Sequence, residues 1–161
     1  MFGNVEDQMT RVFENKSDLL GAVGETLGSS EWVEVTREMV HQFADATGDH
    51  QWIHVDDERA RRESPFGGPI AHGYLTLSLL PLLSKSVYRI DGAKMVVNYG
   101  SDKVRFPSPV PVGAKVRNTA VLSAIEELPN GSLQSQITNT VEIEGVDKPA
   151  VVAQTVARIL F

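Results

Sequence analysis

Pro69-Ile-Ala-His-Gly-Tyr-Leu-Thr-Leu-Ser-Leu-Leu-Pro-Leu-Leu-Ser-Lys-Ser-Val-Tyr88 is the stretch of sequence that decides the fold. Between Tyr74 and Tyr88, apolar side chains occupy nearly every side of a helical wheel, which predicts a helix that is wrapped on most sides. Its most apolar part is only about half as long as the roughly 20 residues that a bilayer requires, and it contains Pro81. We therefore expect a core helix that starts after the Pro-Ile-Ala-His-Gly segment.

The chain after this helix has the pattern of a β-sheet. Residues 133–143 alternate between a mostly apolar face and a face of Gln, Thr and Glu, which is typical of a strand with one side toward the core. Turn-forming sequences separate the expected strands, which cover residues 95–97, 103–106, 116–125, 133–143 and 150–161. One buried helix with about five antiparallel strands predicts an α+β fold in which a curved sheet wraps round the helix.

The chain before the core helix is expected to contain one strand and two helices. Residues 31–36 alternate polar and apolar side chains and predict a strand. Thr36 can then cap a helix that ends at Gly48, because glycine readily adopts the left-handed conformation found at helix ends. The acidic run Asp56-Asp-Glu favours the first turn of a further short helix over residues 56–63.

The first 28 residues are expected to form an N-terminal helical extension, followed by one domain over residues 29–161. The whole chain of 161 residues fits a single core. Apolar residues recur in the extension at helical spacing, at Met9, Val12, Phe13, Leu19, Leu20, Val23 and Leu27.

The composition limits the possible partners and chemistry. A net charge of −6 argues against a nucleic-acid surface, which usually carries a basic excess. The absence of cysteine excludes disulfides, Cys-based zinc sites and a thiol nucleophile. The first residues have neither the basic segment nor the apolar core of a secretory signal. We therefore expect a cytoplasmic protein without a membrane or nucleic-acid partner.

Asp49 and His54 are the candidate catalytic residues. They follow Gly48 on a polar loop, which must fold back to bring them together, because five extended residues span about 17 Å. A carboxylate and an imidazole that lie close together can hold one water molecule for proton transfer. The pair alone is also compatible with an ordinary solvated loop, so the second motif, Pro69-Ile-Ala-His-Gly73, adds weight to the catalytic interpretation.

The order of these motifs resembles the MaoC-like (R)-specific enoyl-CoA hydratase (hydratase 2) family, whose fold is the hot dog. The resemblance covers residues 31–161 and rests on Thr47-Gly-Asp49, His54, Ala60 and the downstream Pro69-Ile-Ala-His-Gly73. Two separated motifs that agree in place and order are more specific than either motif alone.

One departure from the family pattern lies between the two candidate residues. The family usually has Asn-Pro there, and this chain has Gln51-Trp52. This variant is similar to the nodulation-protein-N-like branch of the same superfamily. Trp52 is expected to anchor the loop in the core rather than to contact a ligand.

The resemblance implies addition of water to a trans-2-enoyl thioester, which gives the (R)-3-hydroxyacyl thioester, and the reverse dehydration. Asp49 is the preferred base and His54 the acid that orients the water, and shared or reversed roles remain open. The backbone N–H of Gly73 would stabilise negative charge on the thioester oxygen, although a glycine at this place also permits close helix packing. His72 is expected to bury its ring against the loop.

No cofactor is implied, because coenzyme A enters as part of the substrate. The four histidines lack zinc-binding spacing, so no metal is expected. An acidic protein that binds coenzyme A needs a local cationic patch, for which the candidates are Arg59, Arg61 and Arg62, or Lys103 and Arg105. Among these, Arg62 is the candidate substrate-binding residue, and a solvated helix face is the alternative.

Asn98 and Tyr99 are further candidates for substrate binding. Asn98-Tyr-Gly100 interrupts a predicted strand, which in a hot-dog dimer borders the acyl pocket of the partner. Tyr99 would then line the substrate tunnel. A β-bulge with a packed tyrosine is an equal alternative.

The resemblance implies an acyl-CoA or a carrier-linked acyl thioester as the substrate. A homodimer is expected, because one hot-dog layer leaves an exposed sheet edge that pairing would cover. A non-catalytic subunit that binds acyl thioesters is one alternative, but it has no need of Asp49 and His54 together. A thioesterase is another; that class usually takes its carboxylate from the central helix, and residues 74–88 contain no Asp or Glu.

Overall fold

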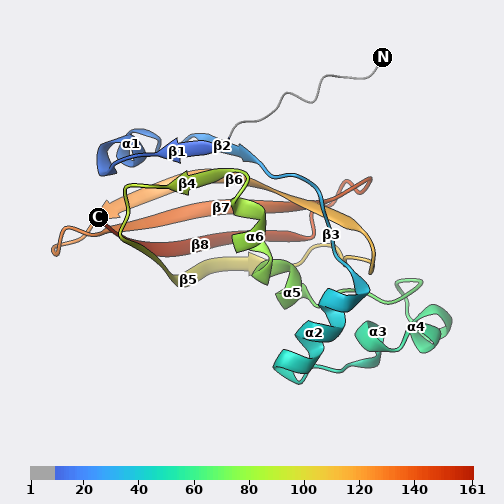
Figure 1. The fold of residues 1–161 in the computed structure, drawn as a ribbon. Helices are drawn as coiled ribbons and strands as arrows, with labels where there is room; N and C mark the ends of the chain where they lie inside the picture. The colour runs from blue at the N-terminus through green and yellow to red at the C-terminus, as the bar shows by residue number, and fades with distance from the viewer. Residues whose placement is uncertain (1–9) are drawn as a thin grey trace, which may run out of the picture.

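The computed structural model describes residues 10–161, and its main feature is a curved antiparallel sheet that lies over two short helices (Figure 1). The strand order is β2-β6-β7-β8-β5, and β3 pairs with β6 beside β2. This arrangement confirms the predicted α+β fold with a sheet wrapped round a central helical segment. The strands of the sheet are β2 (Thr26–Ser29), β3 (Val33–Glu34), β5 (Met95–Arg105), β6 (Lys115–Glu127), β7 (Leu133–Ile143) and β8 (Val151–Leu160).

The sheet confirms the alternating pattern of the second half of the chain. Every second side chain of β7 is buried and the side chains between them are partly exposed. The two strands expected at 95–97 and 103–106 form one strand, β5, in which the register with β8 shifts between Asn98 and Gly100 and again between Ser101 and Lys103. The predicted interruption is therefore a β-bulge within a continuous strand.

The central helical segment is shorter than predicted and is divided in two. The sequence predicts one helix over 74–88, whereas the structure has α5 (Gly73–Ser78) and α6 (Leu80–Ser84). Pro81 lies in the first turn of α6 and cannot donate a backbone hydrogen bond. The preceding turn is tightened, since the Leu79 N–H lies 3.0 Å from the Leu75 oxygen and 3.3 Å from the Thr76 oxygen.

One side of this segment remains open. Leu75 and Leu83 are buried against the sheet, but Tyr74 and Leu82 are 68% and 43% exposed. The expectation of burial on most sides is therefore only partly met within one protomer.

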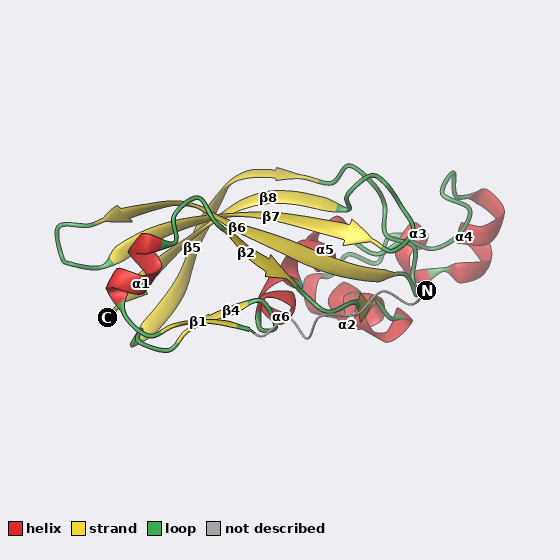
Figure 2. Cartoon of the chain, turned by 90° about the horizontal axis from the view of Figure 1, so that it is seen from above, coloured by secondary structure: helices red, strands yellow, loops and turns green. Residues whose placement is uncertain are grey.

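The helix α2 (Arg37–Thr47) packs beneath one end of the sheet, and α3 (Trp52–Val55) and α4 (Asp57–Glu63) lie at that same end, with α4 farthest out (Figure 2). As predicted, the Thr36 hydroxyl caps α2 by accepting the Met39 N–H at 3.2 Å, and Gly48 ends it with φ 78°. The sequence predicts a polar loop after Gly48. In the structure only residues 49–51 form this loop, because the residues that follow form the helical turn α3.

The N-terminal segment corrects the prediction of a helical extension over 1–28. Residues 1–9 lie outside the described residues. The rest forms β1 (Arg11–Phe13), α1 (Lys16–Gly21) and β2, and β1 pairs in parallel with β4 (Tyr88–Ile90). Because β2 is hydrogen-bonded to β6, this segment is part of the sheet, and the predicted boundary after residue 28 falls inside β2. The helical spacing of the apolar residues predicted helix throughout this segment, although the segment consists of a strand, a helical turn and a second strand.

The core consists of two clusters at opposite ends of the sheet. The first packs α2, α5 and α6 against the sheet near the helical end, around Val35, Val40, Leu75, Leu79, Leu83 and Val141. The second packs the N-terminal segment against the other end, around Phe13, Leu19, Leu27, Leu122, Leu133 and Ile159. Within residues 10–161, no helix is both long and apolar enough to span a membrane.

Candidate active site

Asp49, His54 and a third residue, His72, meet at the end of the sheet where α2, α3 and α5 come together. One nitrogen or oxygen from each side chain lies within 4.8 Å of the other two. Asp49 follows the last turn of α2, His54 lies in α3, and His72 immediately precedes α5. The loop therefore folds back as the catalytic interpretation of the sequence requires.

Local backbone contacts fix this arrangement. Gly48 turns the chain with φ 78°, and the Asp49 Oδ1 then accepts the Gln51 N–H at 3.3 Å. The Ile53 carbonyl accepts the Ile70 N–H at 3.0 Å. This last bond ties α3 to the chain that leads into α5, so His54 and His72 are held side by side.

His54 is buried, and among residues 10–161 only one of its two ring nitrogens has a hydrogen-bond partner. Its exposed fraction is 7%, and its Nδ1 lies 2.6 Å from the Ile70 carbonyl oxygen. A carbonyl can only accept, so Nδ1 carries the hydrogen and Nε2 is the acceptor. Burial lowers the pKa of His54 below its ordinary value, and the adjacent His72 ring also lowers it, while the Ile70 bond and Asp49 act in the opposite direction.

Asp49 presents its carboxylate at the edge of the site. Its side chain is 53% exposed, and Oδ2 lies 4.0 Å from the His72 Nε2. The carboxylate oxygens are hydrogen-bond acceptors that incoming solvent can reach. Asp49 and the His54 Nε2 thus offer two acceptors for the hydrogens of one water molecule.

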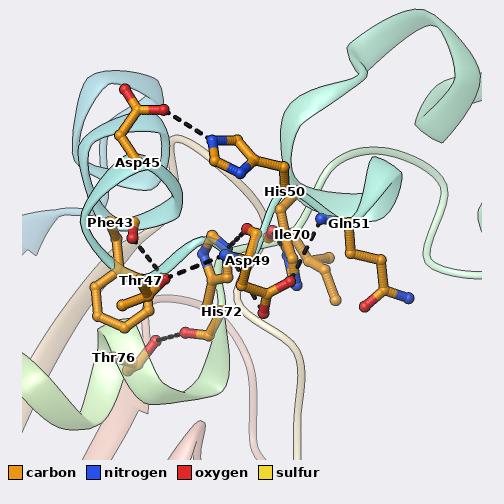
Figure 3. Close-up of polar contacts among 10 residues, drawn as sticks. Phe43, Asp45, Thr47, Asp49, His50, Gln51, Ile70, His72 and Thr76 are labelled. Carbon is orange, nitrogen blue, oxygen red and sulfur yellow. Dashed lines mark hydrogen bonds and ion pairs between the residues drawn. The ribbon is translucent and has the colours of Figure 1, made fainter.

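His72 is the most buried polar group of the site. Its side chain is 3% exposed, and its Nε2 donates to the Asp49 backbone oxygen at 2.9 Å (Figure 3). Its ring stacks on the His54 ring with centroids 3.9 Å apart and lies 5.0 Å from the Phe43 ring. The expectation that His72 buries its ring against the loop is met.

A pocket of about 390 Å³ opens beside His54. It is lined by Gly73 and Thr76 of α5 and by the chain from Phe106 to Val110 that follows β5. Since Gly73 is the first residue of α5, its N–H has no partner within the helix. The pocket therefore combines an imidazole acceptor with a backbone donor.

Gly73 also makes the close packing that was its alternative explanation. A Cβ at this position would lie 3.0 to 3.2 Å from three ring atoms of Phe106. Any larger residue must move the Phe106 ring, which itself lines the pocket. The two explanations of Gly73 are thus compatible.

The candidate substrate-binding residues lie away from this pocket. Asn98 lines a different groove, of about 660 Å³, between α5, α6 and the first half of β5. Tyr99 is 64% exposed, and the Arg158 guanidinium covers its ring at 4.1 Å. Tyr99 is not among the residues that line the groove at Asn98. The role expected for Tyr99 concerns the acyl pocket of a partner subunit, and it stays a prediction.

The arginines of α4 are engaged by neighbours on the same helix. Arg62 bonds Glu63 at 3.0 Å, Arg59 bonds Glu63 at 3.0 Å, and Arg61 lies 3.5 Å from Asp57. The Arg59 guanidinium also lies 4.3 Å from the centre of the Trp52 ring. These ion pairs are typical of a solvated helix face. Trp52 is partly exposed beside Arg59.

The three clustered side chains have the composition of a metal site but not its geometry. The His54 and His72 rings are inclined by only 27° to each other in their stack, so their in-plane lone pairs do not converge on one point. The arrangement suits proton transfer better than coordination of one ion.

Sequence reasoning missed two contributors to the site and underrated a third. The Ile70 carbonyl, which sets the His54 tautomer, and the Phe106 ring carry no sequence signal, because both act through tertiary contact. His72 did carry a signal, since it lies next to Gly73 in a motif that already matched. Its contacts with Asp49 and His54 could not be read from spacing.

Comparison with known proteins identifies the family to which the sequence is similar. A family model described as MaoC like domain matches residues 18–144. The chain is 55% identical over 148 residues to 3-hydroxyacyl-thioester dehydratase Z of Mycobacterium tuberculosis, covering 92% of this chain and 97% of the relative. It is 46% identical over 146 residues to nodulation protein N of Rhizobium meliloti, covering 90% and 91%.

The fold also matches solved structures. An (R)-hydratase from A. caviae involved in PHA biosynthesis superposes with a TM-score of 0.68 and 24% identity, covering 84% of this chain and 94% of that chain. The predicted resemblance to the nodulation-protein-N-like branch is confirmed by the sequence relatives, and the hot-dog fold by the structural match.

Proposed function

The chain belongs to the MaoC-like domain family, and from that premise we propose that it is a lyase that hydrates trans-2-enoyl thioesters to (R)-3-hydroxyacyl thioesters and catalyses the reverse dehydration. The observation that carries the proposal is the pairing of the Asp49 carboxylate with the buried His54, whose Nε2 is a free acceptor. The relative that shares 55% identity is itself named a 3-hydroxyacyl-thioester dehydratase, which supports the same reaction class.

The hydration step uses one water molecule held by both residues. The water donates one hydrogen to the Asp49 carboxylate and the other to the His54 Nε2. As its oxygen bonds to the β-carbon, the O–H bond toward His54 breaks and the proton moves to Nε2. The electron pair of the double bond shifts to the thioester oxygen, which forms an enolate.

Return of the proton completes the reaction. The His54 Nε2–H gives its proton to the α-carbon, the thioester carbonyl is restored, and His54 is neutral again. Hydroxyl and proton arrive from the same side because one histidine handles both. The enolate oxygen is stabilised by the Gly73 N–H, which lines the same pocket as His54.

This division of roles differs from the preference drawn from the sequence, in which Asp49 was the base. The reason is the tautomer of His54. Its Nδ1 bond to Ile70 leaves Nε2 as an acceptor, and burial lowers the pKa of the imidazole, so the neutral form is available at neutral pH. Asp49 then orients the water through its partly exposed carboxylate.

The substrate binds across a homodimer in this proposal. β5 is an edge strand of which every residue except Val104 is exposed, and such an edge is favourable for pairing with a second copy. Asn98 and Arg105 lie seven residues apart, about 24 Å along an extended strand, so Asn98 lies toward the other end of β5 from Phe106, which lines the pocket beside His54.

Antiparallel pairing of two β5 strands would add residues of a partner to the surroundings of this pocket. It brings the Asn98 end of one protomer beside the Arg105 end of its partner, and Phe106, which follows Arg105, lines the catalytic pocket. The acyl chain would then enter a groove supplied by the partner subunit. The thioester carrier is coenzyme A or a carrier-bound pantetheine, and it is the substrate's own group rather than a cofactor.

The experiment incubates the purified full chain with crotonyl-CoA and follows both the enoyl absorbance and free thiol. Loss of the enoyl absorbance without thiol release is the expected result, and chiral chromatography of the product should give the (R)-3-hydroxy acid. Thiol release without loss of the double bond would replace the proposal with hydrolysis. Tight binding with neither change would support a non-catalytic subunit.

A further inference from the structure

We propose that His72 is a positioning residue that holds Asp49 and His54 in their working geometry, through a hydrogen bond to the Asp49 backbone and a ring stack on His54. The role of His72 in the reaction rests on the proposed hydration, whereas the arrangement itself is open to direct observation. His72 does not line the pocket beside His54, so it acts through the two residues that meet the water.

Each side of the His72 ring has a definite neighbour. The His54 ring packs at 3.9 Å between centroids, the Phe43 ring lies at 5.0 Å, and Nε2 donates to the Asp49 oxygen at 2.9 Å. A polar ring with 3% exposure is costly to bury unless its polar atoms are used. Here the one bond it makes fixes the backbone of a catalytic residue.

The backbone of His72 links the same contacts to the pocket. Its carbonyl accepts the Thr76 N–H at 3.2 Å and so anchors the first turn of α5, in which Gly73 is the first residue. One residue therefore touches the Asp49 backbone, the His54 ring and the helix start that carries the Gly73 N–H. A shift of His72 would move these three groups relative to one another.

The hydrogen bond of His72 is chemically specific. The Asp49 carbonyl can only accept, so Nε2 of His72 carries the hydrogen. Nδ1 is buried without a hydrogen-bond partner among residues 10–161, so the ring offers a single donor and two flat faces. Gln can keep the donor without the ring, and Phe can keep the ring without the donor.

The test compares His72→Gln and His72→Phe with wild type in the crotonyl-CoA assay. Loss of one hydrogen bond predicts that His72→Phe lowers kcat by about 10-fold with little change in KM. His72→Gln should stay within about threefold of wild type, because its amide can donate to the Asp49 oxygen. The matched control is His50→Gln. His50 is an exposed histidine next to Asp49, and its ring pairs with Asp45.

A pH profile separates positioning from loss of folded protein. The titratable groups that act on His54 are Asp49, from the loop after α2, and His72, from the chain before α5. Replacing His72 by neutral Gln removes an influence that lowers the pKa of His54, so the acid limb of kcat/KM should move to higher pH. A smaller folded fraction would lower the plateau and leave that limb in place.

The proposal would be overturned if His72→Phe had the same kcat as wild type. It would also be overturned if His72→Phe had a higher kcat than His72→Gln and the acid limb of kcat/KM did not move. If neither variant folds, long-range ¹H–¹⁵N spectra of the wild-type histidines provide the test. They should show His72 with hydrogen on Nε2 and His54 with hydrogen on Nδ1, and the opposite tautomer at His72 would refute the hydrogen bond. An inactive wild-type protein with these tautomers would refute the proposed function and leave the arrangement intact.

Discussion

At the scale of single residues, the chemistry depends on which nitrogen of His54 is free. The sequence places an imidazole five positions after a carboxylate, and that spacing leaves the roles of acid and base open. In the proposed mechanism the Ile70 carbonyl decides between them, because it fixes the hydrogen of His54 on Nδ1. Tautomer assignment requires a tertiary contact, so sequence alone could point to the candidate pair but not to how the roles of acid and base are divided between its two members.

The pH dependence of the reaction follows from the environment of His54. Burial is the largest influence, and it lowers the pKa of the imidazole below 6.5. Below the folded pKa, Nε2 is protonated and cannot take a proton from water, so activity falls as pH decreases through that value. We predict an acid limb of kcat/KM in the hydration direction that lies below pH 6.5, measured with crotonyl-CoA in constant-ionic-strength buffers. A limb above pH 6.5 would be contrary to a buried neutral base.

At the scale of elements, the sequence predicted the helix caps and the alternation of buried and exposed side chains in the strands. It did not predict where a helix is interrupted. Thr36, Gly48 and Asp56 act locally, and each stands at the helix end where the pattern expected it. The alternation in β7 was equally local. The division at Leu79 and the strands β1 and β2 depend on Pro81 and on pairing with distant strands, which periodicity does not report.

The α2 cap provides a stability test that does not depend on function. Thr36→Ala removes the hydroxyl that accepts the Met39 N–H and should lower the free energy of unfolding by about 1 kcal/mol. Thr36→Ser keeps the hydroxyl and serves as the control. Both are measured by urea unfolding, and equal stability of the two variants would show that the cap contributes nothing.

The start of α5 offers a second test at this scale. Gly73→Ala places a methyl group against the Phe106 ring and should reduce kcat/KM by about 10-fold or more, because the oxyanion donor and the pocket wall are both disturbed. Adding Phe106→Leu relieves the contact. If the N–H requires close approach of the thioester, the double variant stays impaired; full recovery would leave packing as the sole role of Gly73.

At the scale of the whole molecule, the pocket beside His54 and the Asn98 groove are lined by different sets of residues, although both include residues of α5. The exposed edge of β5 carries Met95, Val96 and Val97, which are 50%, 51% and 43% exposed. The family resemblance supplied the expectation of a dimer, and the exposed edge of β5 offers a surface where a second copy could pair. No local pattern in the sequence reports this separation.

Disruption of the edge should therefore affect activity as well as assembly. Val97→Lys adds a charge to the β5 edge and is predicted to yield monomers by light scattering and to lower kcat/KM by at least about 10-fold. Val146→Lys, at another exposed valine outside the strands, is the control. A fully active monomer would contradict a site shared between protomers.

The rate of crotonyl-CoA hydration by Asp49→Asn and His54→Gln, each compared with wild type at pH 7 after a matching thermal melt, tests the central claim most directly. Both variants are predicted to lose at least about 100-fold in kcat while they remain folded, because each removes one of the two acceptors that hold and activate the water. Near-wild-type rates in both folded variants would contradict the assignment of this site.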